Sequence, residues 1–395
     1  MKLLVILSRI PYPLEKGDKL RAYEQLKILN QEFDIHLCCL HHDNKIDSKI
    51  TEQLNLISNS HTIIQLRWLA RLWSLLVGFL KGKPIQVSYF HQKKSQYKIN
   101  RIIEKWNPDH IYCQLIRTSE YVKHCNIPKT LDYMDALSKG MDRRSEKASF
   151  FSKIIFNYEY LRLKKYETDI FDSFNFCSII SQPDQKWINH PKNEKILIVP
   201  NGVEKDNFTS YTEVKKDYEV VFTGNMQYAP NVDAAVYLVE EIMPLVWKHN
   251  SHIRLLISGA TPTNKVLSLA SEQVTVTGWV KDMLDSYARS SIFIAPMRLG
   301  SGLQNKLLEA MSMKLPCITT SVANVSLLAN PNENILVADT PDQLAKHIIT
   351  LLNDRVLASS IAEKGHQFIA KHYNWKNSTN ILSNVIHAKK SNFAP

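Results

Sequence analysis

Short apolar runs alternate with amphipathic stretches along the whole chain. Short apolar runs bounded by turn residues are typical of buried strands, whereas apolar positions three and four residues apart are typical of helices. Strands and helices that alternate in this way predict parallel sheets covered by helices on both faces. We therefore expect an α/β fold.

The pattern places predicted elements in both halves of the chain. The predicted strands are Leu3–Leu7, Asp34–Leu40, His61–Leu66, His110–Cys113, Thr130–Tyr133, Phe176–Ile180, Ile196–Val199, Tyr218–Phe222, Arg254–Ser258, Val274–Thr277, Ile292–Ala295 and Cys317–Thr319. The predicted helices are Lys19–Asn30, Ile46–Ser58, Asn100–Trp106, Phe150–Phe171, Asn231–His249, Thr263–Ala270, Met283–Ser290, Asn305–Met313, Pro341–Asn353 and Val356–Lys371.

The turn signal Pro-Asn-Gly within residues 199–204 marks the predicted domain boundary, because strand and helix alternation restarts after it. We expect two Rossmann-like, doubly wound domains, residues 1–199 and 200–375. A C-terminal helix or tail, residues 376–395, is expected to pack back on the first domain. Ligands of such sheets bind at the carboxyl ends of strands, so the sequence predicts a site in a cleft between the domains.

Composition fits a folded protein of two domains, with 395 residues, 44% of them apolar and 22% charged. The formal charge of +11 is uneven: residues 1–200 hold 31 Lys/Arg and 21 Asp/Glu, whereas residues 201–395 hold 18 and 17. A basic first half favours an anionic partner, such as a membrane face, a phospholipid-linked acceptor or nucleic acid. Solvated surface lysines are the alternative.

The six cysteines form no C-x-x-C pair, which predicts reduced, intracellular usage and argues against a disulfide framework or a zinc site. The chain begins with a predicted strand and has no apolar leader, so we expect a cytoplasmic protein. Residues 66–80 are rich in Trp and Leu, but their uninterrupted apolar part is too short to span a bilayer. They predict either a core helix or an interfacial helix on anionic lipid.

Residues 295–309 carry the strongest chemical signal. A predicted strand ends in a loop with Gly300, Ser301 and Gly302, and a helix with Lys306 and Glu309 follows. Glycines let a backbone approach a diphosphate, and the free amides of a helix N-terminus favour its charge. A tight turn with solvated Lys and Glu is the alternative.

Five segments together resemble a known family: residues 9–21, 131–138, 199–203, 222–235 and the run Arg-x-Gly-x-Gly-x-x-x-Lys-x-x-Glu-Ala-Met at 298–311. The chain resembles retaining glycosyltransferases of the two-Rossmann-domain (GT-B) class, in the large bacterial family four. Among these it is similar to exosortase-associated sugar transferases of polysaccharide biosynthesis.

The resemblance implies a nucleotide-sugar donor site, with Glu309 as the second glutamate of the family's usual pair. Ser301 stands where the first glutamate is usual, and Asn225 and Asn231 stand where a cationic pair is usual. We therefore expect Arg298 and Lys306 to neutralise the leaving diphosphate without a metal ion or other cofactor. The remaining expected donor-binding residues are Gly224, Asn225, Trp279, Gly300, Ser301, Gly302 and Leu303. The resemblance places Trp279 at the nucleotide base, and simple packing is the alternative for this residue.

On the acceptor side, the sequence indicates Gly17, Asp18 and Arg21 at the start of a helix, with Arg21 expected at an acceptor phosphate. A solvated first-turn charge is the alternative for Arg21. The resemblance places Asp135 at the donor sugar, where many relatives have a His-Asp pair, and Met134 takes the histidine's place. The alternative for Asp135 is a helix N-cap. Asp135 and Glu309 are the predicted catalytic residues.

The sequence thus predicts transfer of a sugar from a nucleotide-diphosphate donor to a hydroxyl of a lipid-linked glycan, in bacterial surface polysaccharide, capsule or lipopolysaccharide synthesis. We expect peripheral contact with the anionic inner face of the cytoplasmic membrane. The rival interpretations are a nucleotide-sugar epimerase of the same fold and a non-catalytic basic protein that binds membrane or nucleic acid. Basic and aromatic residues do not alternate on one face, which argues against nucleic acid.

Overall fold

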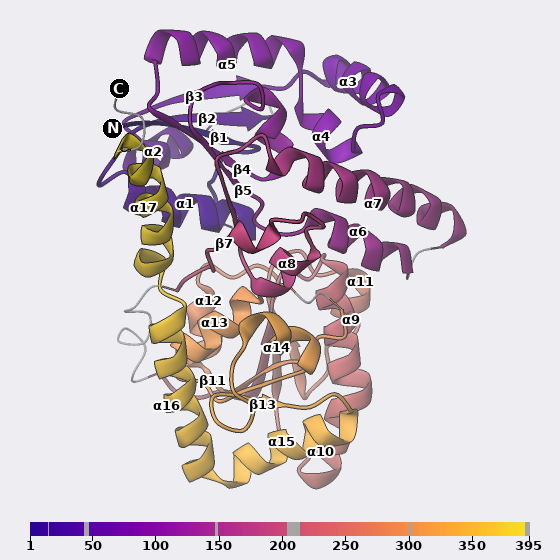
Figure 1. Cartoon of the computed structure of the whole chain (residues 1–395). Coiled ribbons are helices and arrows are strands. Elements are labelled where there is room, and N and C mark those ends of the chain that lie inside the picture. The colour runs from indigo at the N-terminus through magenta and orange to yellow at the C-terminus, as the bar shows by residue number, and fades with distance from the viewer. Residues whose placement is uncertain (15, 43–46, 147–148, 204–213, 300–301, 392–395) are drawn as a thin grey trace. The chain divides into compact units, whose positions relative to one another are not determined.

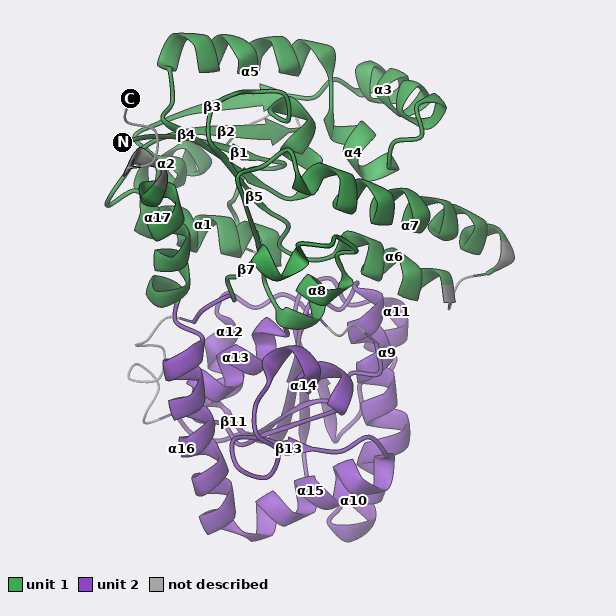
Figure 2. Cartoon of the chain, viewed as in Figure 1, with its two compact units in different colours: residues 1–200, 375–395 green, residues 201–374 purple. Residues whose placement is uncertain are grey.

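The computed structural model describes residues 1–14, 16–42, 47–146, 149–203, 214–299 and 302–391 (Figure 1). The chain divides into two compact units, shown in Figure 2. Unit 1 comprises residues 1–200 and 375–395, and unit 2 comprises residues 201–374. Each unit is built around one parallel sheet, so the predicted α/β class with two parallel sheets is confirmed.

Unit 1 contains a seven-stranded sheet with the order β3-β2-β1-β4-β5-β6-β7, in which every pairing is parallel. Its strands are β1 (Lys2–Leu7), β2 (Asp34–His41), β3 (Ser60–Gln65), β4 (His110–Gln114), β5 (Lys129–Asp132), β6 (Phe176–Ile179) and β7 (Leu197–Ile198). The last of these strands, β7, pairs with β6 at the edge of the sheet.

Helices surround this sheet. They are α1 (Gly17–Leu29), α2 (Ser48–Ile57), α3 (Trp68–Leu80), α4 (Ile85–Phe90), α5 (Lys93–Trp106), α6 (Leu137–Glu146), α7 (Phe150–Phe171), α8 (Gln182–Trp187) and α17 (Trp375–Ser391), with 3-10 turns η1 (Ile116–Tyr121) and η2 (Asn193–Lys195).

Strand β1 shows why the first apolar run becomes the centre of the sheet. Leu4 and Ile6 belong to one buried cluster, and Leu3, Val5 and Leu7 belong to another. Side chains of a strand alternate between the two faces of a sheet, so an unbroken apolar run has two buried faces. The second cluster includes two residues of α17, which therefore packs on unit 1.

Unit 2 contains a six-stranded parallel sheet with the order β10-β9-β8-β11-β12-β13. Its strands are β8 (Tyr218–Thr223), β9 (Leu255–Ser258), β10 (Val274–Val276), β11 (Ser290–Ala295), β12 (Cys317–Thr319) and β13 (Leu336–Val337). Its helices are α9 (Ala229–Tyr237), α10 (Met243–His249), α11 (Asn264–Leu267), α12 (Met283–Ala288), α13 (Asn305–Ser312), α14 (Ser321–Leu327), α15 (Pro341–Asn353) and α16 (Arg355–His372).

Unit 2 differs from the prediction in three elements, of which helix α14 (Ser321–Leu327) was not predicted at all. The helix predicted over Asn231–His249 is interrupted by a π-helical turn, η4 (Leu238–Ile242), between α9 and α10. The two-residue strand β13 was not predicted, because so short a segment has no readable period.

The strand order of each sheet reverses direction at one place, between β1 and β4 in unit 1 and between β8 and β11 in unit 2. At such a switch point the connections on either side leave in opposite directions and open a crevice at the carboxyl ends of the strands. The two switch points are therefore the places where each unit is expected to hold a ligand.

Candidate functional site

The switch point of unit 2 is lined by backbone that only glycine fits. Gly224 follows β8 with φ +152°, and Gly259 follows β9 with φ +149°. A Cβ on Gly224 would lie 2.6 Å from Asn231 Nδ2 and 3.1 Å from Lys306 Nζ, and a Cβ on Gly259 would lie 1.7 Å from the Gly224 carbonyl oxygen. The glycines thus let three segments converge beside Lys306.

Lys306, in the first turn of α13, is a desolvated cation without a contacting carboxylate in the described part of the chain. Its Nζ donates to Asn231 Oδ1 at 2.5 Å and lies 4.7 Å from the centre of the Phe222 ring. Burial lowers the pKa of Lys306 to about 7, although the charge of Glu309 acts in the opposite direction. An anionic ligand phosphate beside this amine favours its protonated form, so the ammonium group is supplied where the phosphate binds.

Glu309 lies one turn further along α13 and is held by a chain of hydroxyl groups. Tyr287 donates to Glu309 Oε2 at 2.7 Å, and the Thr223 hydroxyl lies 2.8 Å from the Tyr287 oxygen. Burial raises the pKa of Glu309, whereas the Tyr287 hydrogen bond and Lys306 lower it. Sequence reasoning missed Tyr287 and Thr223, because neither belongs to a local motif.

The two asparagines in place of the expected cationic pair also have defined partners. Asn231 Nδ2 donates to the Asn225 carbonyl oxygen at 2.9 Å, while its Oδ1 accepts from Lys306. Asn225 Oδ1 accepts from the backbone of Gln227 at 2.9 Å. Asn231 therefore fixes the position of Lys306, a role that the sequence did not predict.

Arg298 faces a different set of residues from the one expected. Its guanidinium forms two hydrogen bonds to Asp233, at 3.1 and 2.9 Å, and lies 3.4 Å from Glu241. It also lies 4.2 Å from the centre of the Tyr237 ring. These partners on α9 and η4 occupy the guanidinium, so the structure pairs Arg298 with carboxylates and leaves Lys306 as the cation beside Gly224.

The loop before α13 is described only in part, and Gly300 and Ser301 lie outside the described residues. Gly302 and Leu303 precede the helix, and Leu303 packs on the core of unit 2. The side chain of Gln304, at the N-cap, makes no capping bond to the helix and instead donates to the Gly302 carbonyl oxygen at 3.0 Å. The first amides of α13 therefore receive no capping bond from Gln304.

Trp279 lies in the loop after β10, immediately after Gly278, whose φ is +74°. Its side chain is 65% exposed. Simple core packing, the alternative for this residue, is therefore excluded, and a base contact stays a prediction.

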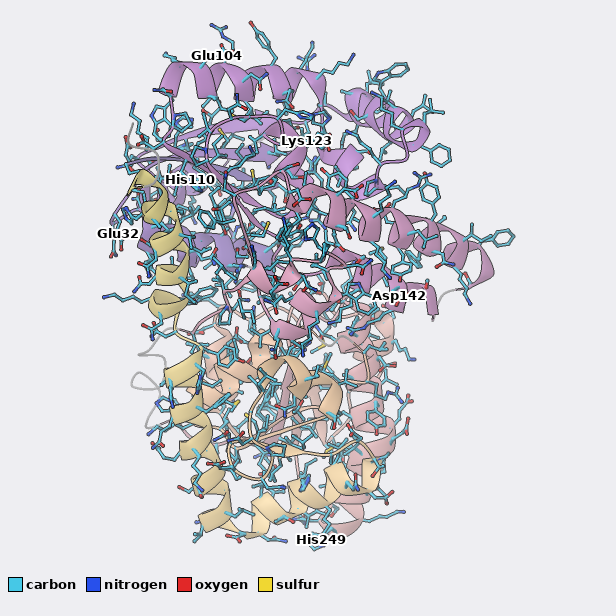
Figure 3. All side chains as sticks on the ribbon, viewed as in Figure 1. Glu32, Glu104, His110, Lys123, Asp142 and His249 are labelled. Atoms are coloured by element: carbon cyan, nitrogen blue, oxygen red, sulfur yellow. The ribbon has the colours of Figure 1, made fainter. Side chains whose placement is uncertain are left out.

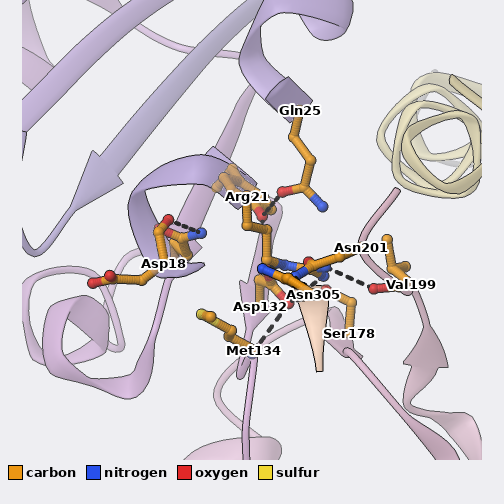
Figure 4. Close-up of polar contacts among 11 residues, drawn as sticks. Asp18, Arg21, Gln25, Asp132, Met134, Ser178, Val199, Asn201 and Asn305 are labelled. Atoms are coloured by element: carbon orange, nitrogen blue, oxygen red, sulfur yellow. Dashed lines mark hydrogen bonds and ion pairs between the residues drawn. The ribbon is translucent and has the colours of Figure 1, made fainter. Parts of the chain in front are cut away.

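In unit 1 the expected role of Arg21 is wrong. Arg21 is fully buried, and its guanidinium forms hydrogen bonds of 2.7 and 3.1 Å to Asp132 at the end of β5 (Figure 4). It donates further to the Val199 carbonyl oxygen at 2.8 Å. Ser178 also donates to Asp132, at 3.0 Å. The carboxylate raises the pKa of Arg21 despite its burial. Neither an acceptor contact nor a solvated first-turn charge fits this network.

The other acceptor-side candidates lie near the start of α1. Gly17 is the first residue of that helix. Asp18 Oδ2 lies 3.3 Å from Arg9 Nε and forms an ion pair with it. These two residues border the switch point of unit 1 because α1 follows β1.

Asp135 lies in the bend between β5 and α6. Burial and the charge of Asp184 raise its pKa to about 7, while Arg21 acts in the opposite direction. The N-cap alternative is not supported, because Glu167 accepts from the Ser138 amide at 3.0 Å and so binds the first turn of α6. A carboxyl group with a pKa near neutrality is suited to proton exchange.

Known proteins share the sequence pattern of unit 2 and the fold of the whole chain. Residues 217–354 match the sequence model of the family described as Glycosyl transferases group 1. A Klebsiella pneumoniae protein, described as an uncharacterized 44.6 kDa protein in the cps region, is 25% identical over 394 residues, which cover 95% of this chain and 97% of that protein.

Two solved structures are similar in fold. HepE of Anabaena, solved with UDP-glucose, is 12% identical with a TM-score of 0.68, and the match covers 98% of this chain and 100% of that one. TarM of S. aureus, solved with fondaparinux, alpha-GlcNAc-glycerol and UDP, is 11% identical with a TM-score of 0.69, at 98% and 100% coverage.

The family match includes Gly224, Lys306 and Glu309, the residues that the fold brings together at the switch point of unit 2. Residues 217–354 therefore resemble a group 1 glycosyltransferase domain in sequence, and the whole chain shares the two-domain fold of HepE and TarM.

Proposed function

We propose that the chain transfers a sugar from a nucleotide-diphosphate donor to a hydroxyl of a growing glycan, with retention of the anomeric configuration, in the synthesis of a surface polysaccharide. The observation that carries the proposal is Lys306, a desolvated cation fixed by an amide at the switch point of unit 2. The relative in the cps region and the sugar and nucleotide ligands of HepE and TarM support the polysaccharide context and the class of donor.

The chemistry requires stabilisation of the diphosphate as it leaves. Negative charge develops on that group in the transition state, and a preorganised cation in a site of low dielectric stabilises it most effectively. Lys306 supplies this cation, and the amides at the start of α13 supply hydrogen-bond donors. We propose that these protein groups suffice without a metal ion.

We propose that Glu309 accepts hydrogen bonds from hydroxyl groups of the donor. Tyr287 occupies one carboxylate oxygen and fixes its orientation. We propose that Asp135 faces the reacting centre, where its pKa of about 7 lets it exchange a proton with a hydroxyl group near neutral pH.

A screen of UDP-, GDP-, ADP- and CMP-sugars by thermal shift tests the donor site. We expect one nucleotide class to raise the melting temperature, because a ligand that binds only the native state stabilises it. Glu309→Gln is expected to retain this shift but lose most sugar transfer. The control Glu272→Gln removes an exposed carboxylate of unit 2 and is expected to change neither.

Absence of binding by every donor contradicts the proposal. An epimerase predicts turnover of the donor in the absence of any glycan, so product analysis without acceptor separates the two reactions.

We further propose that the acceptor is lipid-linked and that unit 1 contacts an anionic membrane on its cytoplasmic face. Helix α3 carries seven large apolar side chains that are 52–76% exposed: Trp68, Leu69, Leu72, Trp73, Leu76, Phe79 and Leu80. Four more, on α7, are 56–80% exposed: Phe151, Ile154, Ile155 and Leu161. We call these eleven residues the α3–α7 surface.

The α3–α7 surface is joined by contacts between its helices. Phe79 stacks on Tyr158 of α7 with ring centres 5.3 Å apart, and Arg162 lies 4.0 Å from the Tyr158 ring. Helix α5, by contrast, carries Glu104 on its outer side (Figure 3). So large an apolar surface is unusual on a protein that meets only water.

Charge favours an anionic bilayer as the partner. The sequence holds no Asp or Glu between residues 66 and 84 or between 147 and 158, while Arg67, Lys81 and Lys153 are exposed. Within the part of the chain that the structure describes, none of the helices is long and apolar enough to cross a membrane. An apolar face with basic neighbours suits a helix that lies in the interface.

Sedimentation with lipid vesicles tests this contact. We expect binding to vesicles that contain phosphatidylglycerol, weaker binding to phosphatidylcholine alone, and loss of binding in Trp73→Ser with Leu76→Ser. The control Val356→Ser removes an exposed apolar residue of unit 2 and is expected to bind as the wild type does. Equal binding by the double variant contradicts the proposal.

A further inference from the structure

Unit 1 contains a cavity of about 950 Å³ at its own switch point. Arg9 and Ile10 follow β1, His41 ends β2, and Arg117 lies three residues past the end of β4, and all four line the cavity. Between β4 and Arg117, Leu115 has φ +64°. The cavity therefore occupies the position where a doubly wound sheet binds ligands, yet none of the sequence motifs pointed to Arg117.

The described lining of the cavity is cationic. It includes four cations and a single carboxylate. The cations are Arg9, Lys16, Lys19 and Arg117, and the carboxylate is Asp47. That carboxylate accepts from the Lys49 amide at 3.1 Å as the N-cap of α2. Like charges gathered around a cavity raise the local concentration of an anion.

Arg117 is the most informative of these cations. Its Nε and Nη2 donate to Gln86 Oε1 at 3.2 and 2.6 Å, and its guanidinium lies 5.5 Å from the centre of the Phe90 ring. Burial and the charge of Arg9 lower the pKa of Arg117 to about 10. In the described residues no carboxylate lies within ion-pair distance of it. A half-buried guanidinium whose partners are a neutral amide and a ring lacks the compensation that a bound anion supplies.

Part of the cavity wall is apolar, and helix α4 contributes three of its residues. Ile85, Tyr89 and Phe90 line it, together with Ile10 and Leu40. A ligand that satisfies both walls has an anionic group next to an apolar one. Helix α4 also connects the cavity to the α3–α7 surface, because Arg71 of α3 donates to the Tyr89 hydroxyl at 2.6 Å.

We propose that this cavity binds the phosphate group of an amphiphilic, phosphate-bearing acceptor, with Arg117 at the phosphate and the α4 wall against the adjoining lipid. Arg9 is already paired with Asp18 and adds positive charge at the rim. The inference rests on the proposed function, since it names the class of acceptor that unit 1 takes. A guanidinium matches phosphate because its planar set of donors can form two parallel hydrogen bonds.

Calorimetric titration of the full chain tests the proposal with three probes: octyl phosphate, inorganic phosphate and octanol. We expect octyl phosphate to bind most tightly, inorganic phosphate to bind weakly and octanol not to bind. Arg117→Gln is expected to weaken octyl phosphate binding about tenfold to a hundredfold, the range for hydrogen bonds to a charged group. Equal affinity in Arg117→Gln, or octanol binding as tightly as octyl phosphate, overturns the proposal.

Two further variants make the result specific. Arg101→Gln removes an exposed arginine of α5 that does not line the cavity, and it is expected to bind as the wild type does. If Arg117→Gln does not fold, Lys19→Gln, which alters a half-buried lining residue, is expected to weaken binding as well, and unchanged affinity there overturns the proposal.

Binding is measured without any sugar donor, so this test can succeed even if sugar transfer fails. UDP serves as a fourth probe. If UDP competes with octyl phosphate in an Arg117-dependent manner, the cavity belongs to the donor and the inference is wrong.

Discussion

Arg21 of unit 1 and Lys306 of unit 2 occupy comparable positions but have opposite environments. Each lies near the start of a helix that follows a strand at the switch point of its sheet. Arg21 is compensated by a carboxylate through two hydrogen bonds, whereas the near partners of Lys306 are an amide oxygen and a ring. The pKa of Arg21 is accordingly raised and that of Lys306 lowered to about 7.

The contrast between Arg21 and Lys306 distinguishes a structural cation from a cation that serves a ligand. A buried cation with its own carboxylate is already compensated within the fold and has no charge left for a phosphate. A buried cation without one costs folding free energy, and this cost is recovered when an anion binds. Arg117 is half-buried and, within the described residues, likewise contacts an amide oxygen and no carboxylate.

The largest effect is expected from Asp132→Ala, which leaves Arg21 buried without its partner. We expect the free energy of unfolding to fall by about 3–5 kcal/mol, measured by urea denaturation. The double variant Arg21→Met with Asp132→Leu removes both charges and is expected to recover most of the loss. A fall below about 1 kcal/mol in the single variant contradicts a structural role for this pair.

Lys306→Met is expected to leave the fold intact and reduce sugar transfer about 10²- to 10³-fold, because the leaving diphosphate loses its cation. Arg298→Gln is the matched comparison, since it removes a cation of the same predicted site that is paired with Asp233. We expect the free energy of unfolding of Arg298→Gln to fall by less than about 1 kcal/mol and its rate of sugar transfer to stay close to that of the wild type. A comparable loss of turnover in both variants means that Arg298 also acts in the donor site.

Gly224→Ala is expected to destabilise unit 2 by about 1–3 kcal/mol, because alanine is strained at φ +152°. Its methyl group would also displace Asn231 and Lys306, so donor affinity is expected to fall. Gly140→Ala serves as the control, because this helical glycine has open space around its Cβ. That change is expected to stabilise the protein by about 0.5–1 kcal/mol in thermal or urea unfolding.

The smallest effect concerns pH. Between pH 7 and the ordinary lysine pKa of 10.5, the unfolded chain holds a proton at Lys306 that the native state lacks. The free energy of unfolding therefore rises with pH in this window, by at most about 1.4 kcal/mol per pH unit from this group. Urea denaturation at pH 7.5 and 9 is expected to show a smaller rise in Lys306→Met. An identical rise in both proteins means that Lys306 keeps its ordinary pKa.

Most of the fold could be predicted from the sequence, because hydrophobic periodicity and turn residues are local properties of the chain. The bounds predicted for the strand Cys317–Thr319 and the helices Phe150–Phe171 and Pro341–Asn353 are those of the structure. The environment of helix α3 could not be predicted, because its apolar residues indicate that a face is covered but not whether protein or lipid covers it. In unit 1 that face remains largely exposed.

The sequence by itself identified the segment that carries Lys306 and Glu309, because glycines, a strand end and a helix start lie together within a few residues. Only the tertiary structure decided which cations are free to act. Charge compensation depends on residues distant along the chain: Asp132 pairs with Arg21, Asp233 pairs with Arg298, and Asn231 takes the place of a carboxylate at Lys306. Local sequence sets which charges are present, but long-range packing sets which of them are neutralised.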